Sequence, residues 1–223
     1  MNLLHQHESV LDAAYQWTFT SEPKTVPVHE PGPVYAFVPA HGDSKAGAVQ
    51  EHLGRTWSED FGLAVLLVDF ASDRDEDEGS SDRAAIRRED GMDRCTFRGT
   101  EGRALRKLIA SARSNYEVIC VDLTGAPKAA AKAILNSAHS VFLVSDSGRE
   151  SLKMARATVA KLRPFKMEDR LALLLRRIPG GLRPDLAEDL AGAPVCGLVE
   201  TSEQLERLAR WLALPQPEFA IAV

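Results

Sequence analysis

The sequence HGDSKAGA, which begins at His41, has part of the composition of a loop that holds phosphate. Such a loop needs glycines, so that backbone N–H groups can turn toward the phosphate oxygens. It also needs a lysine to neutralise those oxygens and a Ser or Thr hydroxyl to hold Mg²⁺. The segment offers Gly42, Ser44, Lys45 and Gly47. Asp43 instead adds a negative charge near the presumed phosphate, and like charges repel.

The residues on both sides of this segment predict the elements that would position it. The apolar run 34–39 predicts a buried strand before the loop, and the apolar run 64–70 predicts a second strand after it. Between them, apolar residues recur every four positions, which predicts a helix with one apolar stripe. These residues are Val49, Leu53, Trp57 and Phe61. A strand, loop, helix and strand in this order form the unit in which α/β proteins hold nucleotides.

Strands and helices alternate in the rest of the chain. The patterns predict helices at 105–112, 129–137, 150–161, 184–190 and 202–214, and strands at 118–123, 141–145, 171–175 and 195–199. This alternation predicts an α/β fold, with a doubly wound, mostly parallel sheet flanked by helices. Ligands of such sheets bind beyond the carboxyl ends of the strands, so the loops there should meet at one edge. Those loops follow Pro39, Phe70, Leu123, Ser145 and Leu175.

The same patterns divide the chain into parts. We expect one α/β domain at 34–214, an N-terminal extension and linker at 1–33, and a C-terminal tail at 215–223. Charged residues interrupt the alternation at 72–99, which we expect to be a mobile, solvated loop. Its acidic run Asp73–Glu78 could bind a partner, although a solvated loop is the commoner outcome for such a run.

Composition argues against several classes of protein. The net charge is −5 and no block of Lys and Arg occurs, so we expect no nucleic-acid partner. No apolar run approaches the length of a membrane span, and the N-terminus lacks the pattern of a secretory signal. The widely spaced Cys95, Cys120 and Cys196 suggest a reducing compartment, and no His or Cys pair has metal-ligand spacing. We therefore expect a cytoplasmic protein.

Several stretches, in the same order along the chain, resemble the MinD/ParA family of P-loop ATPases. That group includes the CpaE/TadZ-type pilus-localisation proteins and is related to the bacterial tyrosine kinases. The matching stretches lie between residues 34 and 214 and read HGDSKAGA, VLLVDFA, YEVICVDLTG, AHSVFLVS, LLLRR and APVCGLVE. The resemblance implies a three-layer fold of the P-loop NTPase type, with ATP and Mg²⁺ as cofactors.

The phosphate-loop signature of that family, K-G-G-x-G-K-T-T, is altered in this chain. Aligned on Leu53, the family's Lys falls on Ala46 and its two Thr fall on Gly47 and Ala48. A shift by one residue would give Lys45 the role of the Lys, but Ala46 and Gly47 would then stand at the hydroxyl positions. Neither register supplies both the Lys and the Mg²⁺-binding hydroxyl. The resemblance therefore implies a degenerate Walker A loop, which makes ATP and Mg²⁺ binding doubtful.

Three further positions match functional positions of the family. The resemblance implies that Asp122 and Asp69 are tentative Mg²⁺ ligands, although Ala71 replaces the family's next acid. It also places Arg176 where the family often has an adenine-reading Asn. The residues alone leave another interpretation open, because an Asp at a strand end also caps the turn that follows it. For Lys45, a solvated loop side chain is favoured over phosphate contact.

The last predicted helix carries a stripe of Leu205, Leu208, Ala209 and Leu212. MinD relatives use a C-terminal amphipathic helix as a membrane anchor. Acidic and basic residues cancel on the polar face of this helix, whereas membrane-surface helices favour Lys and Arg. We therefore expect the helix to dock on the sheet, without peripheral membrane contact.

Together, these observations predict a non-hydrolysing MinD/ParA-like protein that binds a protein partner or forms a homodimer. It would position or regulate a pilus, secretion, motility or polysaccharide machine. One alternative is an active ATPase with an unusual loop, which would use Lys45 and Asp122 as a nucleotide-dependent dimer switch. Another is a non-kinase modulator related to the tyrosine kinases, since the segment around Tyr15 loosely resembles their oligomerisation segment. The chain has no tyrosine cluster at its C-terminus, which disfavours the kinase itself.

Overall fold

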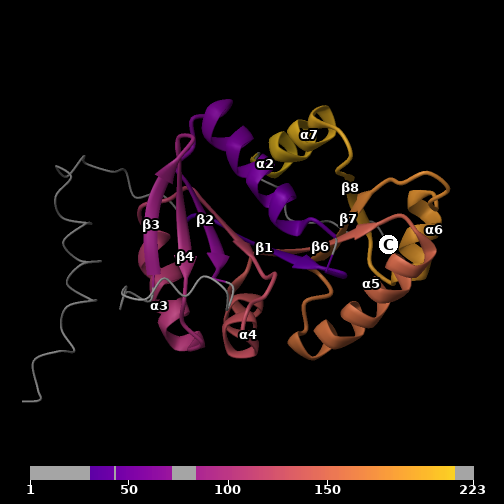
Figure 1. Cartoon of the computed structure of the whole chain (residues 1–223), viewed down its shortest axis with the longest axis horizontal. Coiled ribbons are helices and arrows are strands. Elements are labelled where there is room, and N and C mark those ends of the chain that lie inside the picture. Colours follow the sequence, from indigo (N-terminus) through magenta and orange to yellow (C-terminus); the bar gives the residue numbers. More distant parts are fainter. Residues whose placement is uncertain (1–30, 43, 72–83, 214–223) are drawn as a thin grey trace, which may run out of the picture.

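An eight-stranded sheet is the middle layer of the computed structural model, which describes residues 31–42, 44–71 and 84–213 (Figure 1). The strand order is β3-β4-β2-β5-β1-β6-β7-β8. All neighbouring strands are parallel except β3 and β4, which are antiparallel. The strands are β1 Val34–Pro39, β2 Val65–Phe70, β3 Ala84–Glu89, β4 Met92–Phe97, β5 Val118–Asp122, β6 Ser140–Asp146, β7 Leu171–Arg176 and β8 Val195–Leu198.

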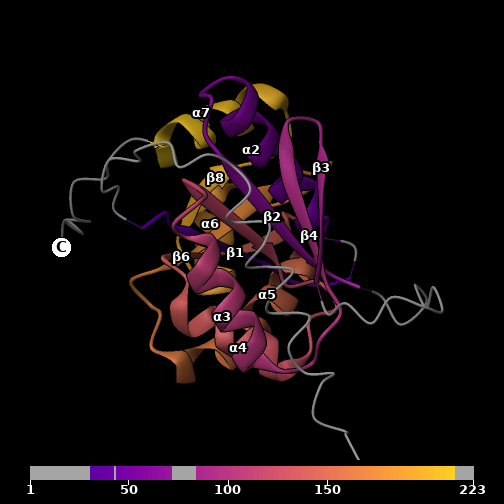
Figure 2. The ribbon, with the colours of Figure 1, turned by 90° about the vertical axis from the view of Figure 1, so that its left-hand side faces the viewer.

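Helices cover both faces of the sheet (Figures 1 and 2). One face packs against α3, α4, α5 and α6, and the opposite face packs against α2 and α7. The helices are α2 Ala46–Glu59, α3 Gly102–Ala112, α4 Lys128–Ser137, α5 Arg149–Leu162, α6 Pro184–Ala191 and α7 Ser202–Ala213, with a short 3₁₀ turn at Arg163–Phe165. Within the described ranges, no helix is long and apolar enough to span a bilayer.

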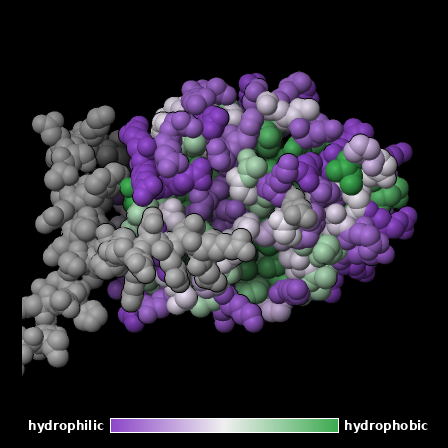
Figure 3. All heavy atoms as spheres, viewed as in Figure 1, coloured by the Kyte–Doolittle hydropathy of each residue, from purple (hydrophilic) through white to green (hydrophobic). Residues whose placement is uncertain are grey.

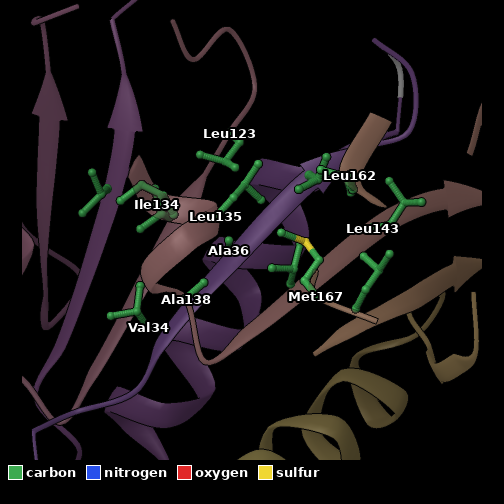
Figure 4. Packing of buried hydrophobic residues seen from close by; sticks show 14 of the residues in the cluster. Val34, Ala36, Leu123, Ile134, Leu135, Ala138, Leu143, Leu162 and Met167 are labelled. Atoms are coloured by element: carbon green, nitrogen blue, oxygen red, sulfur yellow. The ribbon is translucent and has the colours of Figure 1, made fainter. Parts of the chain in front are cut away.

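The central strand β1 lies between β5 and β6 and is buried on both faces. Because successive side chains of a strand point to opposite faces, its residues divide between two cores. Val34, Ala36 and Val38 contribute to the core under α3 to α6, part of which is drawn in Figure 4. Tyr35 and Phe37 contribute to the core under α2 and α7. This two-sided burial explains why the strand reads as a continuous apolar run.

The structure corrects the prediction for the charged segment 72–99. Part of it forms the hairpin of β3 and β4, not an irregular loop. In β4 the apolar residues Met92, Cys95 and Phe97 are buried, while β3 is the edge strand and its residues are mostly exposed. An edge strand with one solvated side needs few apolar residues, so its sequence resembles that of a loop. The acidic run Asp73–Glu78 lies outside the described residues.

The other predicted elements are confirmed within a few residues at each end. The parallel pairing brings the predicted loops to the carboxyl edge of the sheet, as expected. The apolar stripe of α7 is buried against the sheet and α2, and the indole Nε1 of Trp57 donates a 2.9 Å hydrogen bond to the Ala209 carbonyl. Cys120 is buried, as predicted. The N-terminal extension up to residue 30 and the tail from residue 214 lie outside the described residues.

The start of β1 is held by a histidine from the loop between α4 and β6. The Val34 N–H donates to His139 Nδ1 at 2.9 Å, and Arg113 Nη2 lies 3.1 Å from His139 Nε2. Arg113 also donates to the Gly32 carbonyl at 3.0 Å. Burial lowers the pKa of the His139 imidazole, and the nearby cations Arg113 and Arg170 lower it further. The neutral imidazole is therefore the form that fits this site.

We expect stability to fall as the pH drops below the ordinary histidine value of about 6.5. Below that pH the unfolded chain protonates His139 while the folded chain does not, so protons favour unfolding until the lowered folded pKa is passed. Urea denaturation at several pH values measures the effect. Replacing His139 by Asn retains an acceptor for Val34 but no titration, and should flatten part of the profile. An unchanged profile in that variant would contradict the assignment.

Candidate functional site

The loop between β1 and α2 lies at the carboxyl edge of the sheet, beside the central strand. The Ala40 N–H donates to the Val144 carbonyl at 2.9 Å, so the loop leaves β1 alongside β6. The Ser44 N–H donates to the His41 carbonyl at 3.1 Å, which closes a tight turn. Helix α2 begins directly afterward, at Ala46. Asp43 of this loop lies outside the described residues.

Lys45, the residue before α2, has a left-handed backbone conformation with φ 57° and ψ 37°. Only glycine adopts this conformation without a steric penalty, which for other residues is roughly 1–2 kcal/mol. Its side chain makes no capping hydrogen bond to the helix, and the residue is exposed. The backbone at this position therefore has the shape that a glycine of a phosphate loop would adopt.

Asp122, at the end of β5, faces the first turn of α2. A Cβ atom added to Gly47 would lie 2.7 Å from Asp122 Oδ2, closer than real Cβ atoms come to an oxygen. The other carboxylate oxygen, Oδ1, accepts hydrogen bonds from Thr124, at 2.9 Å from its N–H and 2.7 Å from its hydroxyl. The carboxyl group therefore occupies the space next to Gly47 where a larger residue would place its side chain.

Burial raises the pKa of the Asp122 carboxyl, the hydrogen bonds from Thr124 oppose that rise, and the negative charge of Asp69 adds to it. The effect of Asp69 means that the carboxylates of Asp69 and Asp122 are close enough to interact electrostatically. The hydrogen bonds from Thr124 form an Asx-type turn, which is the capping interaction that a strand-end Asp commonly makes. In the described part of the chain, however, no group of three His, Cys, Asp or Glu residues could hold a metal ion.

Asp69, at the end of β2, forms an ion pair with Arg94 of the neighbouring strand β4. Arg94 Nη1 lies 2.5 Å from Asp69 Oδ2, and the same guanidinium lies 3.1 Å from Glu89 and 3.4 Å from Glu51. Burial alone would lower the pKa of Arg94, but the three carboxylates raise it above its ordinary value. Three acidic residues therefore surround Arg94, and Asp69 belongs to that cluster.

Arg176, at the end of β7, forms an ion pair with Asp146 at the end of β6. The guanidinium binds the carboxylate through two atoms, with Nε 2.5 Å from Oδ1 and Nη2 2.9 Å from Oδ2. His41 of the β1–α2 loop joins them, since its Nε2 lies 3.8 Å from Asp146 Oδ2. The side chains of His41 and Asp146 are 12% and 13% exposed, so this cluster is largely shielded from water. Arg176 is therefore directed at a carboxylate of the chain itself.

Two buried polar groups next to the loop have no hydrogen-bond partner among the described protein atoms. One is the hydroxyl of Ser44, which is 1% exposed. The other is the side-chain oxygen of Gln50, whose Nε2 donates to the carbonyls of Val68 and Cys120 at 3.3 and 2.9 Å. Gln50 is thus a buried polar bridge from α2 to the ends of β2 and β5.

The structure brings most of the sequence-predicted site residues to one edge. Gly42 and the residues Ser44 to Gly47 form the loop and the start of α2, and Asp122 lies against Gly47. Asp69 and Arg176 end β2 and β7, which are separated by β5, β1 and β6 in the sheet, and each is paired with a residue of this chain. Whether any of these residues binds nucleotide or metal stays a prediction.

Sequence reasoning missed Gln50, Arg94 and Asp146. Gln50 gave a readable signal, because a polar residue within the apolar stripe of a helix implies a buried hydrogen bond. Arg94 gave none, since it stood in a segment that was predicted to be a loop. Asp146 follows an apolar run after one intervening residue, Ser145, and could have been identified by its position at a strand end, which it shares with Asp122.

No model of a protein family matches this sequence, and no curated protein matches it. Solved structures with the same fold include a ParA family ATPase from Chlorobium tepidum, with 16% identity and a TM-score of 0.62, over 83% of this chain and 94% of that one. The MinC:MinD cell division protein complex from Aquifex aeolicus gives 15% identity and a TM-score of 0.66, over 83% and 99%.

Cobyrinic acid a,c-diamide synthase from Mycobacterium smegmatis, with bound ADP and magnesium, gives 16% identity and a TM-score of 0.58, over 85% of this chain and 99% of that one. At such identities the likeness shows the fold alone. The predicted fold class is thereby confirmed, because this chain has the three-layer α/β fold of MinD/ParA-type P-loop ATPases.

We expect the substitution Gly47→Ala to change the free energy of unfolding differently in the native chain and in an Asp122→Ala background. An alanine normally stabilises a helix position by about 0.5–1 kcal/mol relative to glycine. In the native chain that gain should be lost, because the new methyl group would meet the Asp122 carboxylate. In an Asp122→Ala background the gain should appear. Urea denaturation of the two single variants and the double variant measures the coupling, and additive effects would contradict the close approach.

Proposed function

We propose that this chain is a non-hydrolysing protein of the MinD/ParA fold that acts by binding a protein partner. The observation that carries the proposal is the contact between the first turn of α2 and Asp122. Where the family resemblance places a Mg²⁺-binding Thr, this chain has Gly47, and the Asp122 carboxylate lies in the space beside it. A P-loop ATPase needs a hydroxyl there to hold the metal that bridges the phosphates.

The backbone of Lys45 supports the same alignment. A left-handed residue immediately before the helix matches the glycine that precedes the Lys of the family signature. In that register Ala46 takes the place of the phosphate Lys, and Lys45 does not. The alternative of an active ATPase requires the shifted register, in which a left-handed, exposed Lys45 would have to bind the phosphates.

The remaining nucleotide positions support the proposal through their charge pairing. Arg94 neutralises Asp69, and Asp146 neutralises Arg176, so both groups have an internal counter-ion without any ligand. In a site built for Mg-ATP, such charges would instead be completed by the metal and phosphates. The sheet edge that binds nucleotide in proteins of this fold would here have its charges already paired within the chain.

The solved structures suggest what such a surface could do. They include a complex of MinD with MinC, a plasmid partition protein and a cell division ATPase. By analogy, we propose that this chain positions or regulates a partner complex, such as a pilus, secretion, motility or polysaccharide machine, as a homodimer or with another protein. This step rests on fold analogy.

Calorimetric titration with Mg-ATP and Mg-ADP tests whether the chain has a working nucleotide-binding site. We expect no binding up to millimolar nucleotide for the native chain. The triple variant Lys45→Gly, Ala46→Lys, Gly47→Thr restores the family residues and should gain binding, provided that the Asp122 carboxylate rotates away. The single variant Lys45→Gly is the matched control, because it relieves the backbone without adding a phosphate ligand.

Two results would overturn this proposal. One is ATP turnover by the native chain that disappears in Lys45→Ala, which would establish the active-ATPase alternative. The other is tight nucleotide binding by the native chain that is lost in Asp122→Ala, which would mean a nucleotide-dependent switch. Sedimentation velocity of the native chain, with and without nucleotide, distinguishes a constitutive homodimer from a nucleotide-driven one.

A further inference from the structure

Exposed basic residues gather on the two adjacent helices α3 and α4, which cover one face of the sheet, and on the turn before α3. Figure 1 shows these helices side by side below the sheet, and Figure 3 shows that most of the surface visible in that view is hydrophilic. We call this group the basic strip. Its members, all exposed, are Arg98, Arg103, Arg106, Lys107, Lys128 and Lys132.

The cations of the basic strip differ from Arg94 and Arg176 because they have no acidic partner within the described ranges. Arg94 and Arg176 are held by carboxylates. None of the six strip residues forms an ion pair or a side-chain hydrogen bond with another described residue. Six like charges gathered without counter-ions repel each other, so an anionic partner would be stabilised there.

The helices hold these charges in two neighbouring rows. On α3, Arg103 and Lys107 are one turn apart, and on α4 Lys128 and Lys132 are one turn apart. The rows are close because α3 and α4 touch at Gly102, where an added Cβ would lie 2.3 Å from the Ala129 carbonyl. One helical turn separates charges by about 6 Å along the axis. Alternate side chains of an extended peptide are about 6.8 Å apart, which is a similar spacing.

A hollow of about 190 Å³ continues the basic strip at the start of α3. It is lined by Arg98, Gly99, Thr100, Glu101 and Ala104. Arg98 brings a cation of the basic strip to this hollow, and Glu101 brings one carboxylate. An acidic segment that enters the hollow would therefore place its own carboxylates toward Arg98.

The size of the strip favours a short anion over a long one. The paired cations of each row stand one turn apart, so each row is only about 6 Å long. A nucleic-acid duplex carries a charge every 1.7 Å or so along its axis, so most of its phosphates would lie beyond these two rows. A short acidic peptide segment places its few carboxylates within that length.

We propose that the basic strip is the docking surface for an Asp/Glu-rich segment of a protein partner. The segment lies extended along α3 and α4, with alternate carboxylates paired to the two rows of cations. This inference rests on the proposed function, since it supplies the chemistry by which the partner is recognised. It does not depend on the nucleotide edge, because none of the strip residues belongs to the β1–α2 loop.

Fluorescence anisotropy of the full chain with a labelled hexapeptide of alternating Glu and Ser tests the proposal. We expect micromolar binding at low salt that weakens steeply as salt is added. The double variants Arg103→Glu/Lys107→Glu and Lys128→Glu/Lys132→Glu should each weaken binding at least about tenfold, because each turns two attractions into repulsions. The matched control is Arg156→Glu/Lys161→Glu on α5, which changes the same charge on exposed residues and should change binding less than about twofold.

The comparison ligands are the same peptide with Gln for Glu and a short DNA duplex. Binding of the Gln peptide, equal loss in the α5 control, or tighter binding of the duplex would each overturn the proposal. Binding that appears only after Asp73–Glu78 is neutralised would also overturn it, because the chain's own acidic run would then be the occupant. Circular dichroism melts confirm that the variants fold. If the nucleotide titration instead finds a working ATP site, the proposed function fails, but peptide binding to the strip would still stand as measured.

Discussion

The two-sided burial of β1 is the constraint on which the rest of the structure depends. This strand lies between two other strands and contributes to both cores, with Val34 and Phe37 fully buried on opposite faces. Its neighbours β5 and β6 must pair with it in parallel, so their ends stop at the same edge. The β1–α2 loop, Asp122 and Asp146 are therefore neighbours because of packing, whatever ligand the edge does or does not bind.

Because packing of the strands, and not ligand binding, places the β1–α2 loop, a phosphate loop can lose its polar residues without loss of the fold. Backbone hydrogen bonds hold the loop, through Ala40 to β6 and through Ser44 to His41. The charges nearby are balanced inside the chain, by Arg94 for Asp69 and by Arg176 for Asp146. A charge that is partly buried needs such a partner, since an unpaired one would cost several kcal/mol. By contrast, the basic strip is solvated and can remain unpaired until a partner arrives.

Most of the fold could be predicted from the sequence because its strands are buried on both faces. Continuous apolar runs such as 34–39 and 118–123 cannot be accommodated at a surface, and the helices between them have clear apolar stripes. The hairpin of β3 and β4 could not be predicted, because an edge strand such as Ala84–Glu89 needs no apolar face. Its pairing is decided by backbone hydrogen bonds to β4, which any sequence of suitable shape can make.

The location of the candidate site could be predicted from the sequence, but the ion pairs between its carboxylates and guanidinium groups could not. Strand ends and the loop at Gly42 follow from the alternating pattern, as do Asp69 and Asp122. Which carboxylate meets which guanidinium depends on neighbours that are distant in sequence, such as Asp146 and Arg176. The position of Asp122 against Gly47 depends on how closely α2 approaches β5, a distance that no local pattern encodes.

The strand order also has a consequence for synthesis of the chain on the ribosome. The strand that forms the centre of the sheet is made first, but Val34 pairs with Ile119 and Tyr35 with Ser140. The two strands that pair with β1 therefore emerge well after it. Contacts so distant in sequence slow folding and expose apolar surface during elongation. Until β6 has been translated, β1 cannot complete its pairing on both sides.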